Sequence, residues 1–258
     1  MPVKVLKKVF NAIPDFALKN KFMCFFMNNF KRHRFKSAYI SGHFEHRFDN
    51  GILLKSYEKI FYSLTVLLDG YLGRYSIKKG DVIVDCGATN GDFAIYAAMA
   101  AGDEGVVYAF EPERINYERL LRNIDLNGVK NIRAVNKGIW SRSGKLKMDL
   151  GRGFVSLSES RAGDDGQAVD VVSLDEALSG KRVDFIKMDI EGAEIEAVKG
   201  ARKILSDNDV NMAVASYHIV SGRMSSVQLE RLLKEYGYSA ETSFEPHPTT
   251  YANKRYAR

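Results

Sequence analysis

The sequence predicts an α/β protein with a mainly parallel sheet and helices on both faces, preceded by a helical and hairpin extension. Two observations predict this fold class. From about residue 80 onward, short β-branched runs alternate with helical stretches, and such alternation implies right-handed crossovers between parallel strands. The 258 residues are 45% hydrophobic and 27% charged, which is ordinary for a globular chain with a sizeable core.

The net charge of +6 is concentrated in residues 1–36, which hold nine lysines and arginines and one acid, Asp15. This segment therefore carries +8, and the rest of the chain carries −2. Apolar residues among the lysines predict amphipathic helices broken near Pro14, forming a cap on the main domain. The alternative is a surface for an anionic partner: a membrane leaflet, a lipid-linked glycan or a nucleic acid.

Cysteine and histidine usage gives no sign of disulfides or of a metal site. Cys24 and Cys86 are the only cysteines and form no CxxC motif, so we expect a protein of the reducing cytoplasm. The apolar run 22–27 is too short to span a bilayer, and no signal-peptide cleavage pattern follows it. His43 and His46 form an H-x-x-H pair without a third ligand nearby, so we expect no bound metal.

Residues 1–75 are predicted to form the extension. In it, residues 43–48 and 51–55 flank Asp49-Asn50 and predict a hairpin, because Asn-Gly tolerates the positive φ of tight turns. A helix is expected over 57–68.

Residues 76–258 are predicted to form the main domain, with β-branched runs as strands and periodic apolar runs as helices. Pro112 ends one strand and Asn127-Gly128 ends one helix. Glycine- and serine-rich hairpin material follows the third strand. The expected strands are 82–84, 105–110, 131–136, 183–188 and 211–216, the expected helices are 93–101, 117–127, 191–205 and 227–236, and a closing hairpin is expected at 238–243 and 249–256.

Ligands of open α/β sheets bind outside the carboxyl ends of the strands. The residues that end the predicted strands are therefore the candidate site residues. They are Asp85, Glu111, Asn136, Asp189 and His218.

A glycine loop follows the first strand of the main domain. It reads Asp85-Cys86-Gly87-Ala88-Thr89-Asn90-Gly91, and we expect Asp85, Gly87, Ala88, Asn90 and Gly91 to contact a cofactor. Glycine lets the main chain approach a ligand closely. Thr89 and Asp92 stand where a dinucleotide fingerprint requires glycines, which disfavours a pyrophosphate cradle. The alternative is that the glycines only shape a tight turn.

Glu111 ends the second strand, about twenty residues after the glycine loop. A carboxylate there can accept hydrogen bonds from both ribose hydroxyls, which favours an unphosphorylated ribose. The alternative is an acid that only stabilises the following helix N-terminus. Asn136, at the end of the third strand, is a further candidate for the cofactor pocket.

Three carboxylates follow the fourth strand in the segment 189–194. Asp189 is expected beside the glycine loop, in both cofactor binding and catalysis, if the fourth strand neighbours the first. Glu191 is a second catalytic candidate, although acids also favour helix N-termini for structural reasons. His218 could take a proton from an attacking hydroxyl because its unperturbed pKa lies near neutrality. The alternative is a structural histidine bound to a loop carbonyl.

Four segments together resemble the FkbM-type methyltransferases, over roughly residues 80–220. They are 84–91, Tyr108-Ala109-Phe110-Glu111-Pro112, 173–178, and 184–194 with its Lys187-Met188-Asp189-Ile190-Glu191-Gly192-Ala193-Glu194 motif. The resemblance implies a class I S-adenosylmethionine-dependent methyltransferase (Rossmann-like): a seven-stranded sheet, order 3-2-1-4-5-7-6, with an antiparallel last strand.

The resemblance further implies that S-adenosylmethionine is the cofactor. Asp85, Gly87 and Gly91 would line its pocket and Glu111 would hold its ribose. The implied reaction is O-methylation of a hydroxyl on a small molecule or glycan. This chain has Ser216-Tyr217-His218 where many relatives carry an acid after the fifth strand, so no catalytic base is carried over from the family.

Three other readings stay open. An RNA methyltransferase would use the basic N-terminus, but the fourth strand lacks the Asn/Asp-Pro-Pro-aromatic motif of many amino-directed base methylases. A non-catalytic nucleotide-binding or membrane-surface module would use the same features without turnover. A nicotinamide oxidoreductase is less favoured because of the glycine spacing.

Overall fold

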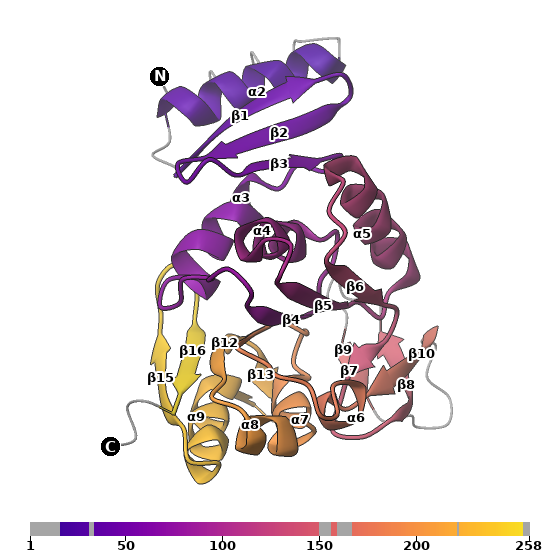
Figure 1. The fold of residues 1–258 in the computed structure, drawn as a ribbon, viewed down its shortest axis with the longest axis vertical. Coiled ribbons are helices and arrows are strands. Elements are labelled where there is room, and N and C mark those ends of the chain that lie inside the picture. The colour runs from indigo at the N-terminus through magenta and orange to yellow at the C-terminus, as the bar shows by residue number, and fades with distance from the viewer. Residues whose placement is uncertain (1–15, 31–33, 150–155, 159–166, 221, 255–258) are drawn as a thin grey trace. The chain divides into compact units, whose positions relative to one another are not determined.

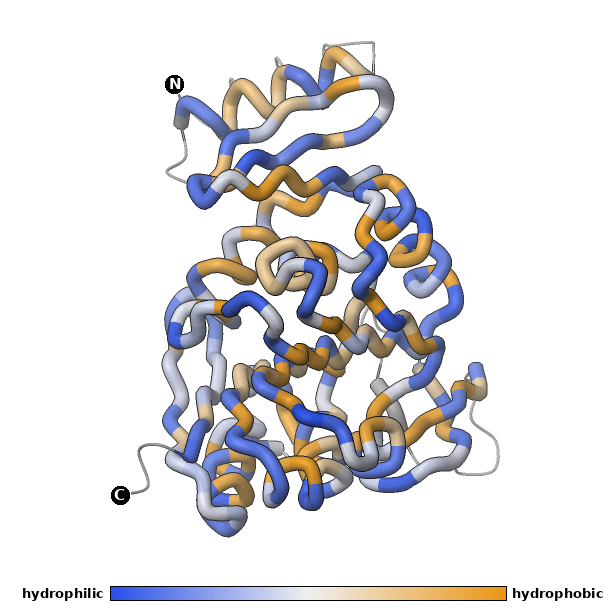
Figure 2. Tube along the Cα trace, viewed as in Figure 1, coloured by the Kyte–Doolittle hydropathy of each residue, from blue (hydrophilic) through white to orange (hydrophobic). Residues whose placement is uncertain are grey.

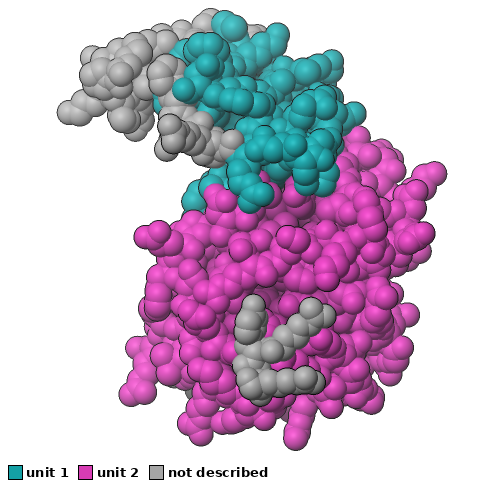
Figure 3. All heavy atoms as spheres, turned by 60° about the vertical axis from the view of Figure 1, so that its left-hand side comes forward, with its two compact units in different colours: residues 1–65 teal, residues 66–258 magenta. Residues whose placement is uncertain are grey.

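The computed structural model describes residues 16–30, 34–149, 156–158, 167–220 and 222–254. The chain divides into two compact units, residues 1–65 and 66–258 (Figure 3). This division lies about ten residues before the expected boundary at residues 75 and 76, since the π-helix Val66–Tyr71 contacts a strand of the second unit. The helices expected before Pro14 fall outside the described residues.

The first unit is a helix on a three-stranded antiparallel sheet. Helix α2 (Phe16–Phe30) contacts β1 (Phe35–Ile40), β1 pairs with β2 (His43–Phe48), and β2 pairs with β3 (Leu53–Ser56). The β2–β3 pairing confirms the predicted hairpin. Strand β1 was not predicted. The predicted helix over 57–68 is divided into the short α3 (Phe61–Thr65) and the π-helix.

A histidine lies in the core of the first unit. His46 points to the same buried face as Phe44 and is itself fully buried. Its Nδ1 lies 2.8 Å from Ser37 Oγ, and its ring contacts Phe61 edge-on. Burial lowers its pKa to about 4, so the ring is neutral in the folded protein at neutral pH.

The second unit is built on a seven-stranded sheet with the order β15-β16-β12-β11-β4-β5-β6. Strand β16 is antiparallel to its neighbours β15 and β12. The pairings among β12, β11, β4, β5 and β6 are parallel. Numbered along the chain this is 3-2-1-4-5-7-6, which confirms the implied topology. The strands are β4 (Val82–Cys86), β5 (Val106–Phe110), β6 (Ile132–Val135), β11 (Phe185–Met188), β12 (Asn211–Ala215), β15 (Ser239–Ser243) and β16 (Thr249–Asn253).

Helices cover both faces of this sheet, with α4 and α5 on one side and α7, α8 and α9 on the other (Figure 1). The central strands β4 and β11 are largely buried, as strands covered on both faces must be, and the middle of the sheet is mostly hydrophobic (Figure 2). Helix α5 ends at Gly128 as predicted, with φ +65°. The helices are α4 (Asp92–Ala101), α5 (Arg114–Asn127), α6 (Leu174–Ala177), α7 (Glu194–Lys199), α8 (Arg202–Asp207) and α9 (Ser225–Glu235).

One expectation about this unit needs correction. The helix predicted over 191–205 is two helices, α7 and α8, separated at Gly200, where a Cβ would lie 2.3 Å from the Trp140 carbonyl oxygen. The hairpin expected after the third strand is confirmed, since β8 and β9 pair antiparallel, and it belongs to a second sheet with the order β7-β10-β8-β9. Its strands are β7 (Gly138–Ile139), β8 (Gly144–Asp149), β9 (Ser156–Ser158) and β10 (Gln167–Val172).

A two-stranded ribbon, β13 (Ile219–Val220) and β14 (Arg223–Met224), follows β12. Within the described ranges, no helix combines the length and the apolar character needed to cross a bilayer.

His46 predicts a pH-dependent stability of the first unit. The folded-state pKa of about 4 lies below the ordinary value of 6.5, so the stability that the neutral ring contributes is complete above pH 6.5 and is lost as the pH falls toward 4. Between pH 8 and pH 5 we expect a loss of about 2 kcal/mol. Hydrogen exchange of the β2 amides measures this loss, and His46→Phe should abolish most of it. An equal pH dependence in both proteins would refute the assignment.

Candidate active site

A buried lysine connects the two central strands below the candidate site. Strands β11 and β4 place Lys187 beside Asp85 in register. Lys187 Nζ lies 3.0 Å from Asp85 Oδ1 and donates a hydrogen bond to the Gly87 carbonyl oxygen at 2.8 Å. Burial opposes the charge of Lys187, but the carboxylates of Asp85 and Asp189 raise its pKa above the usual value. Asp85, a predicted cofactor residue, is therefore fully buried and holds Lys187 in place.

The glycine loop turns tightly against the end of β11. Gly87 has φ +81°, and a Cβ on it would lie 2.0 Å from the Asp189 carbonyl oxygen. The N–H groups of Gly87 and Ala88 both donate to the Phe110 carbonyl, at 2.9 and 3.0 Å. The glycine at position 87 is thus required by packing within the protein as well as by its positive φ.

The remaining loop residues shape the turn. Gly91 has φ +92°, and a Cβ there would lie 2.5 Å from Leu120 Cδ1. The Asn90 carbonyl accepts a hydrogen bond from Asn123 Nδ2 at 2.9 Å. These contacts attach the start of α4 to α5.

Glu111 lies opposite the turn. Its two carboxylate oxygens accept hydrogen bonds from the N–H groups of Thr89 (2.8 Å) and Glu113 (2.9 Å). Burial raises its pKa to about 7. Asn136 is exposed and donates to the carbonyls of Glu111 (2.7 Å) and Pro112 (3.1 Å), so it supports this corner from the outside.

A pocket lies between the turn, Glu111 and the end of β11, at the carboxyl ends of the strands. Among its described lining residues, three are acids and none is basic. Five of the predicted cofactor residues are not among those that line it and lie behind or beside its wall: Asp85, Ala88, Asn90, Gly91 and Asn136. The lining residues are Gly87, Thr89, Phe110, Glu111, Pro112, Asn116, Gly138, Ile139, Asp189, Ile190 and Glu191.

Asp189 is placed beside the glycine loop, as its strand order predicted. Its N–H donates to the Cys86 carbonyl at 3.0 Å. Two tyrosine hydroxyls donate to its carboxylate, Tyr71 to Oδ2 at 2.7 Å and Tyr217 to Oδ1 at 3.0 Å. Tyr71 comes from the π-helix, far away in the sequence, and was not predicted as a site residue.

His218 is held between two carboxylates. Its Nε2 lies 3.1 Å from Glu191 Oε2 and its Nδ1 lies 3.1 Å from Glu194 Oε1. Burial alone would lower its pKa, but the hydrogen bonds with Glu191 and Glu194 raise it to about 10. The expectation of a base that titrates near neutrality therefore needs correction, because this ring is an imidazolium at pH 7 with no free lone pair.

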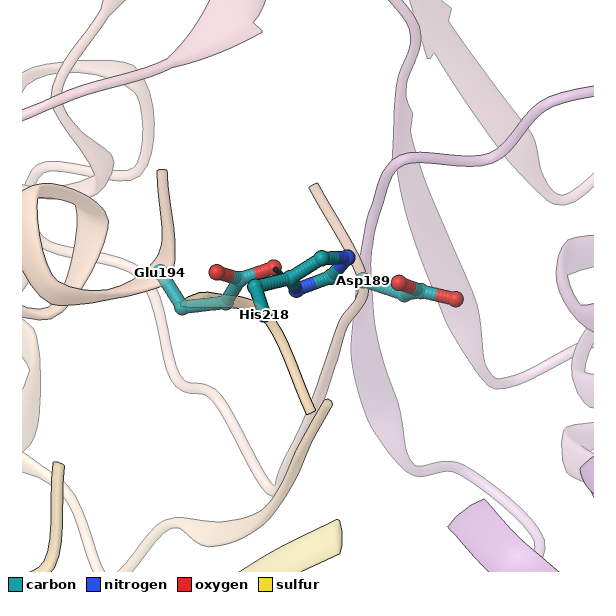
Figure 4. Close-up of side chains that lie close together, drawn as sticks. All are labelled: Asp189, Glu194 and His218. Carbon is teal, nitrogen blue, oxygen red and sulfur yellow. Dashed lines mark ion pairs between the residues drawn. The ribbon is translucent and has the colours of Figure 1, made fainter. Parts of the chain in front are cut away.

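The same cluster has the composition of a cation site. Asp189, Glu194 and His218 offer ligand atoms within 4.8 Å of one another, and Figure 4 shows the His218 ring between the two acids. Both ring nitrogens already face carboxylates, so a metal ion would have to displace a ring proton. The imidazolium itself supplies the positive charge among these acids.

The strand order and a pocket at the strand ends define a class I S-adenosylmethionine-dependent methyltransferase, as predicted. Residues 85–240 match the model of the methyltransferase FkbM domain. The chain belongs to this family, which confirms the resemblance, the enzyme class and the methyl donor.

Relatives carry methyltransferase names. The methyltransferase sdnD of Sordaria araneosa is 27% identical over 192 residues, covering 60% of this chain and 73% of the relative. The hexuronic acid methyltransferase AglP of Haloferax volcanii is 25% identical over 144 residues, covering 55% and 57%. A crystal structure of a methyltransferase FkbM from Methylobacillus flagellatus shares the fold, with a TM-score of 0.51, 23% identity and coverage of 69% and 44%. The chain thus spans little more than half of AglP and less than half of that crystallised chain.

The contact between Gly87 and Asp189 predicts that an alanine at position 87 and an alanine at position 237 have different effects on binding of S-adenosylmethionine. Gly237 has the same φ of +81° as Gly87, but a Cβ there would meet nothing within 4 Å. Gly237→Ala should cost about 1–2 kcal/mol of unfolding free energy and leave binding of S-adenosylmethionine unchanged. Gly87→Ala should abolish that binding in calorimetry. Equal binding by the two variants would contradict the role of this contact.

Proposed function

We propose that this protein transfers the methyl group of S-adenosylmethionine to a hydroxyl oxygen of a small molecule or glycan. The observation that carries this proposal is the charge of the pocket, whose described lining contains three acids and no basic residue. Such a lining suits a cationic sulfonium nucleoside and repels a pyrophosphate. The residues present therefore fit S-adenosylmethionine better than a nicotinamide dinucleotide.

Glu111 and the glycine turn would hold the cofactor. The Glu111 carboxylate is fixed by two main-chain N–H groups and has further lone pairs for the two ribose hydroxyls. Gly87 presents bare main chain, and the bond from Lys187 keeps its carbonyl in place. Ala88, Asn90 and Gly91 act by shaping the turn, and Asn136 by supporting Glu111. The cofactor supplies a methyl group already activated by its sulfonium, so the protein's main task is alignment.

Asp189 is the proton acceptor in this proposal. Asp189 is among the residues that line the pocket, and its carboxylate would take the proton that the acceptor hydroxyl loses as its oxygen is methylated. The doubly paired imidazolium of His218 holds Glu191 and Glu194 in position. His218 and Glu191 therefore shape the site without removing the proton.

The charge of this corner also favours a neutral acceptor. Asp189, Glu191 and Glu194 surround a single imidazolium, which leaves an excess of negative charge beside the pocket. A carboxylate acceptor, or the phosphates of RNA, would be repelled there. The acceptor of AglP is, by its name, a hexuronic acid, and we propose that this chain takes an uncharged hydroxyl compound.

We also propose that the first unit contacts an anionic membrane surface. Phe16, Leu18 and Phe25 of α2 are each more than half exposed, and Lys21, on the same helix, is exposed too. Residues 1–36 carry a charge of +8. Exposed apolar side chains among lysines are the pattern of helices that lie in the headgroup region of a bilayer. This contact would bring a lipid-linked acceptor to the enzyme.

Calorimetry with S-adenosylmethionine tests the assignment of Glu111. Because the free carboxyl has a pKa of about 7 and the ribose hydroxyls require the ionised form, affinity should fall by up to about tenfold from pH 8 to pH 6. Glu111→Gln should lose about 1–3 kcal/mol of binding free energy and this pH dependence. Glu118→Gln, on the exposed side of α5, is the control. Tighter binding of NAD than of S-adenosylmethionine would end the proposal.

Vesicle sedimentation tests the membrane contact. Leu18→Ser/Phe25→Ser should weaken binding to phosphatidylserine-containing vesicles at least about tenfold, since two apolar side chains no longer enter the bilayer. Val227→Ser/Phe244→Ser removes equally exposed side chains of the second unit and should change nothing. Neutral phosphatidylcholine vesicles should bind weakly. Tight binding to short RNA without vesicle binding would contradict the membrane proposal.

A further inference from the structure

A chain of hydrogen-bonding groups extends behind Asp189, away from the pocket. Tyr71 donates its hydroxyl hydrogen to Asp189 Oδ2 at 2.7 Å, and the same hydroxyl lies 3.1 Å from His247 Nε2. His247 Nδ1 in turn lies 3.3 Å from Thr249 Oγ1. Neither Tyr71 nor His247 is among the described residues that line the pocket.

The fold holds these groups rigidly. Tyr71 ends the π-helix and is 5% exposed, and Thr249 at the start of β16 is fully buried. The rings of Tyr71 and His247 pack edge-to-face, with centroids 5.1 Å apart. Gly70 lies so close to His247 that a Cβ would be 2.8 Å from Cε1. The histidine ring therefore has little freedom to turn away from Tyr71.

Thr249 determines which ring nitrogen of His247 carries the hydrogen. Thr249 Oγ1 donates its own hydrogen to the His247 carbonyl at 3.2 Å, so it faces Nδ1 with a lone pair. This geometry is satisfied when Nδ1 bears the ring proton and Nε2 is an acceptor. Tyr71 has one hydrogen for two acceptors, Asp189 Oδ2 and His247 Nε2.

We propose that Tyr71 and His247 relay the proton that Asp189 removes from the acceptor hydroxyl, an inference that rests on the proposed function. The acceptor O–H bond breaks and an O–H bond forms on Asp189. Asp189 then passes a proton to the Tyr71 oxygen while the original Tyr71 hydrogen moves to His247 Nε2. Asp189 is a carboxylate again, Tyr71 is neutral, and His247 holds the proton as an imidazolium. Tyr71 and His247 are thus positioning residues that act through Asp189.

The surroundings of His247 suit this role. It faces Tyr71 from the π-helix, Lys187 from β11, Asp189 directly after β11, and Tyr217 after β12. Burial and the charge of Lys187 lower its pKa, against the opposing effect of Asp189, so the ring is neutral at pH 7 and free to accept a proton. Tyr217 is the matched contrast, since it also donates to Asp189 but lies outside the path from Tyr71 to His247.

Histidine ring ¹⁵N NMR tests the relay without a methyl acceptor. In Asp189→Ala, Tyr71 loses its carboxylate acceptor and its hydrogen should turn to His247, so the Nε2 resonance shifts. The His247→Gln spectrum identifies that resonance. Adding Tyr71→Phe to Asp189→Ala should remove the shift, and adding Tyr217→Phe should leave it. An unshifted resonance, or a shift that survives Tyr71→Phe, would overturn the relay.

Turnover gives the second measurement, as release of S-adenosylhomocysteine with a panel of neutral sugars as acceptors. Tyr71→Phe and His247→Gln should each lower kcat about tenfold or more, part of the ~10²–10⁴ that positioned proton removal contributes, with KM unchanged. Both should remove the fall of kcat at acid pH that protonation of His247 causes. Tyr217→Phe should keep it. If kcat of His247→Gln falls over the same pH range as that of the wild type, the relay alone is overturned, whereas a wild-type protein that does not bind S-adenosylmethionine overturns the proposed function.

Discussion

The site depends on one buried ion pair, between Lys187 of β11 and Asp85 of β4. Lys187 also donates to the Gly87 carbonyl, and Gly87 packs on the Asp189 carbonyl. The ends of the neighbouring strands β4 and β11 therefore lie close enough for their main chains to be in contact. Removing one partner of such a pair leaves a buried, uncompensated charge, at a cost of about 3–5 kcal/mol. The pocket wall and the proposed proton acceptor are thus fixed by the same contacts.

From this junction the pocket acquires its chemistry. One side is the glycine turn with Glu111, whose oxygens are held by main-chain N–H groups. The other side is Asp189, held by tyrosines from two distant segments. Beside it the His218 imidazolium sits between two glutamates. Acids thus outnumber bases around the pocket, which favours a cationic cofactor and an uncharged acceptor.

Local sequence predicted much of this structure, and long-range contacts account for what it missed. The strand ends and the glycine loop were predictable because turn chemistry and β-branched runs are local signals, while the strand order came from the family resemblance. The role of His218 was not predictable, since its pKa depends on glutamates 24 and 27 residues away. Tyr71 gave no signal, because it meets Asp189 across 118 residues. Strand β1 was not predicted, because the turn signal of the hairpin that follows it is stronger than any signal in residues 35–40.

A crystal structure with S-adenosylhomocysteine tests the central claim most directly, because it shows where a nucleoside lies relative to both halves of the pocket. The account predicts that both ribose hydroxyls donate to the Glu111 carboxylate and that the sulfur faces Asp189 beside the Gly87 turn. A nucleoside bound elsewhere, or a pocket from which packed side chains exclude it, would contradict the account.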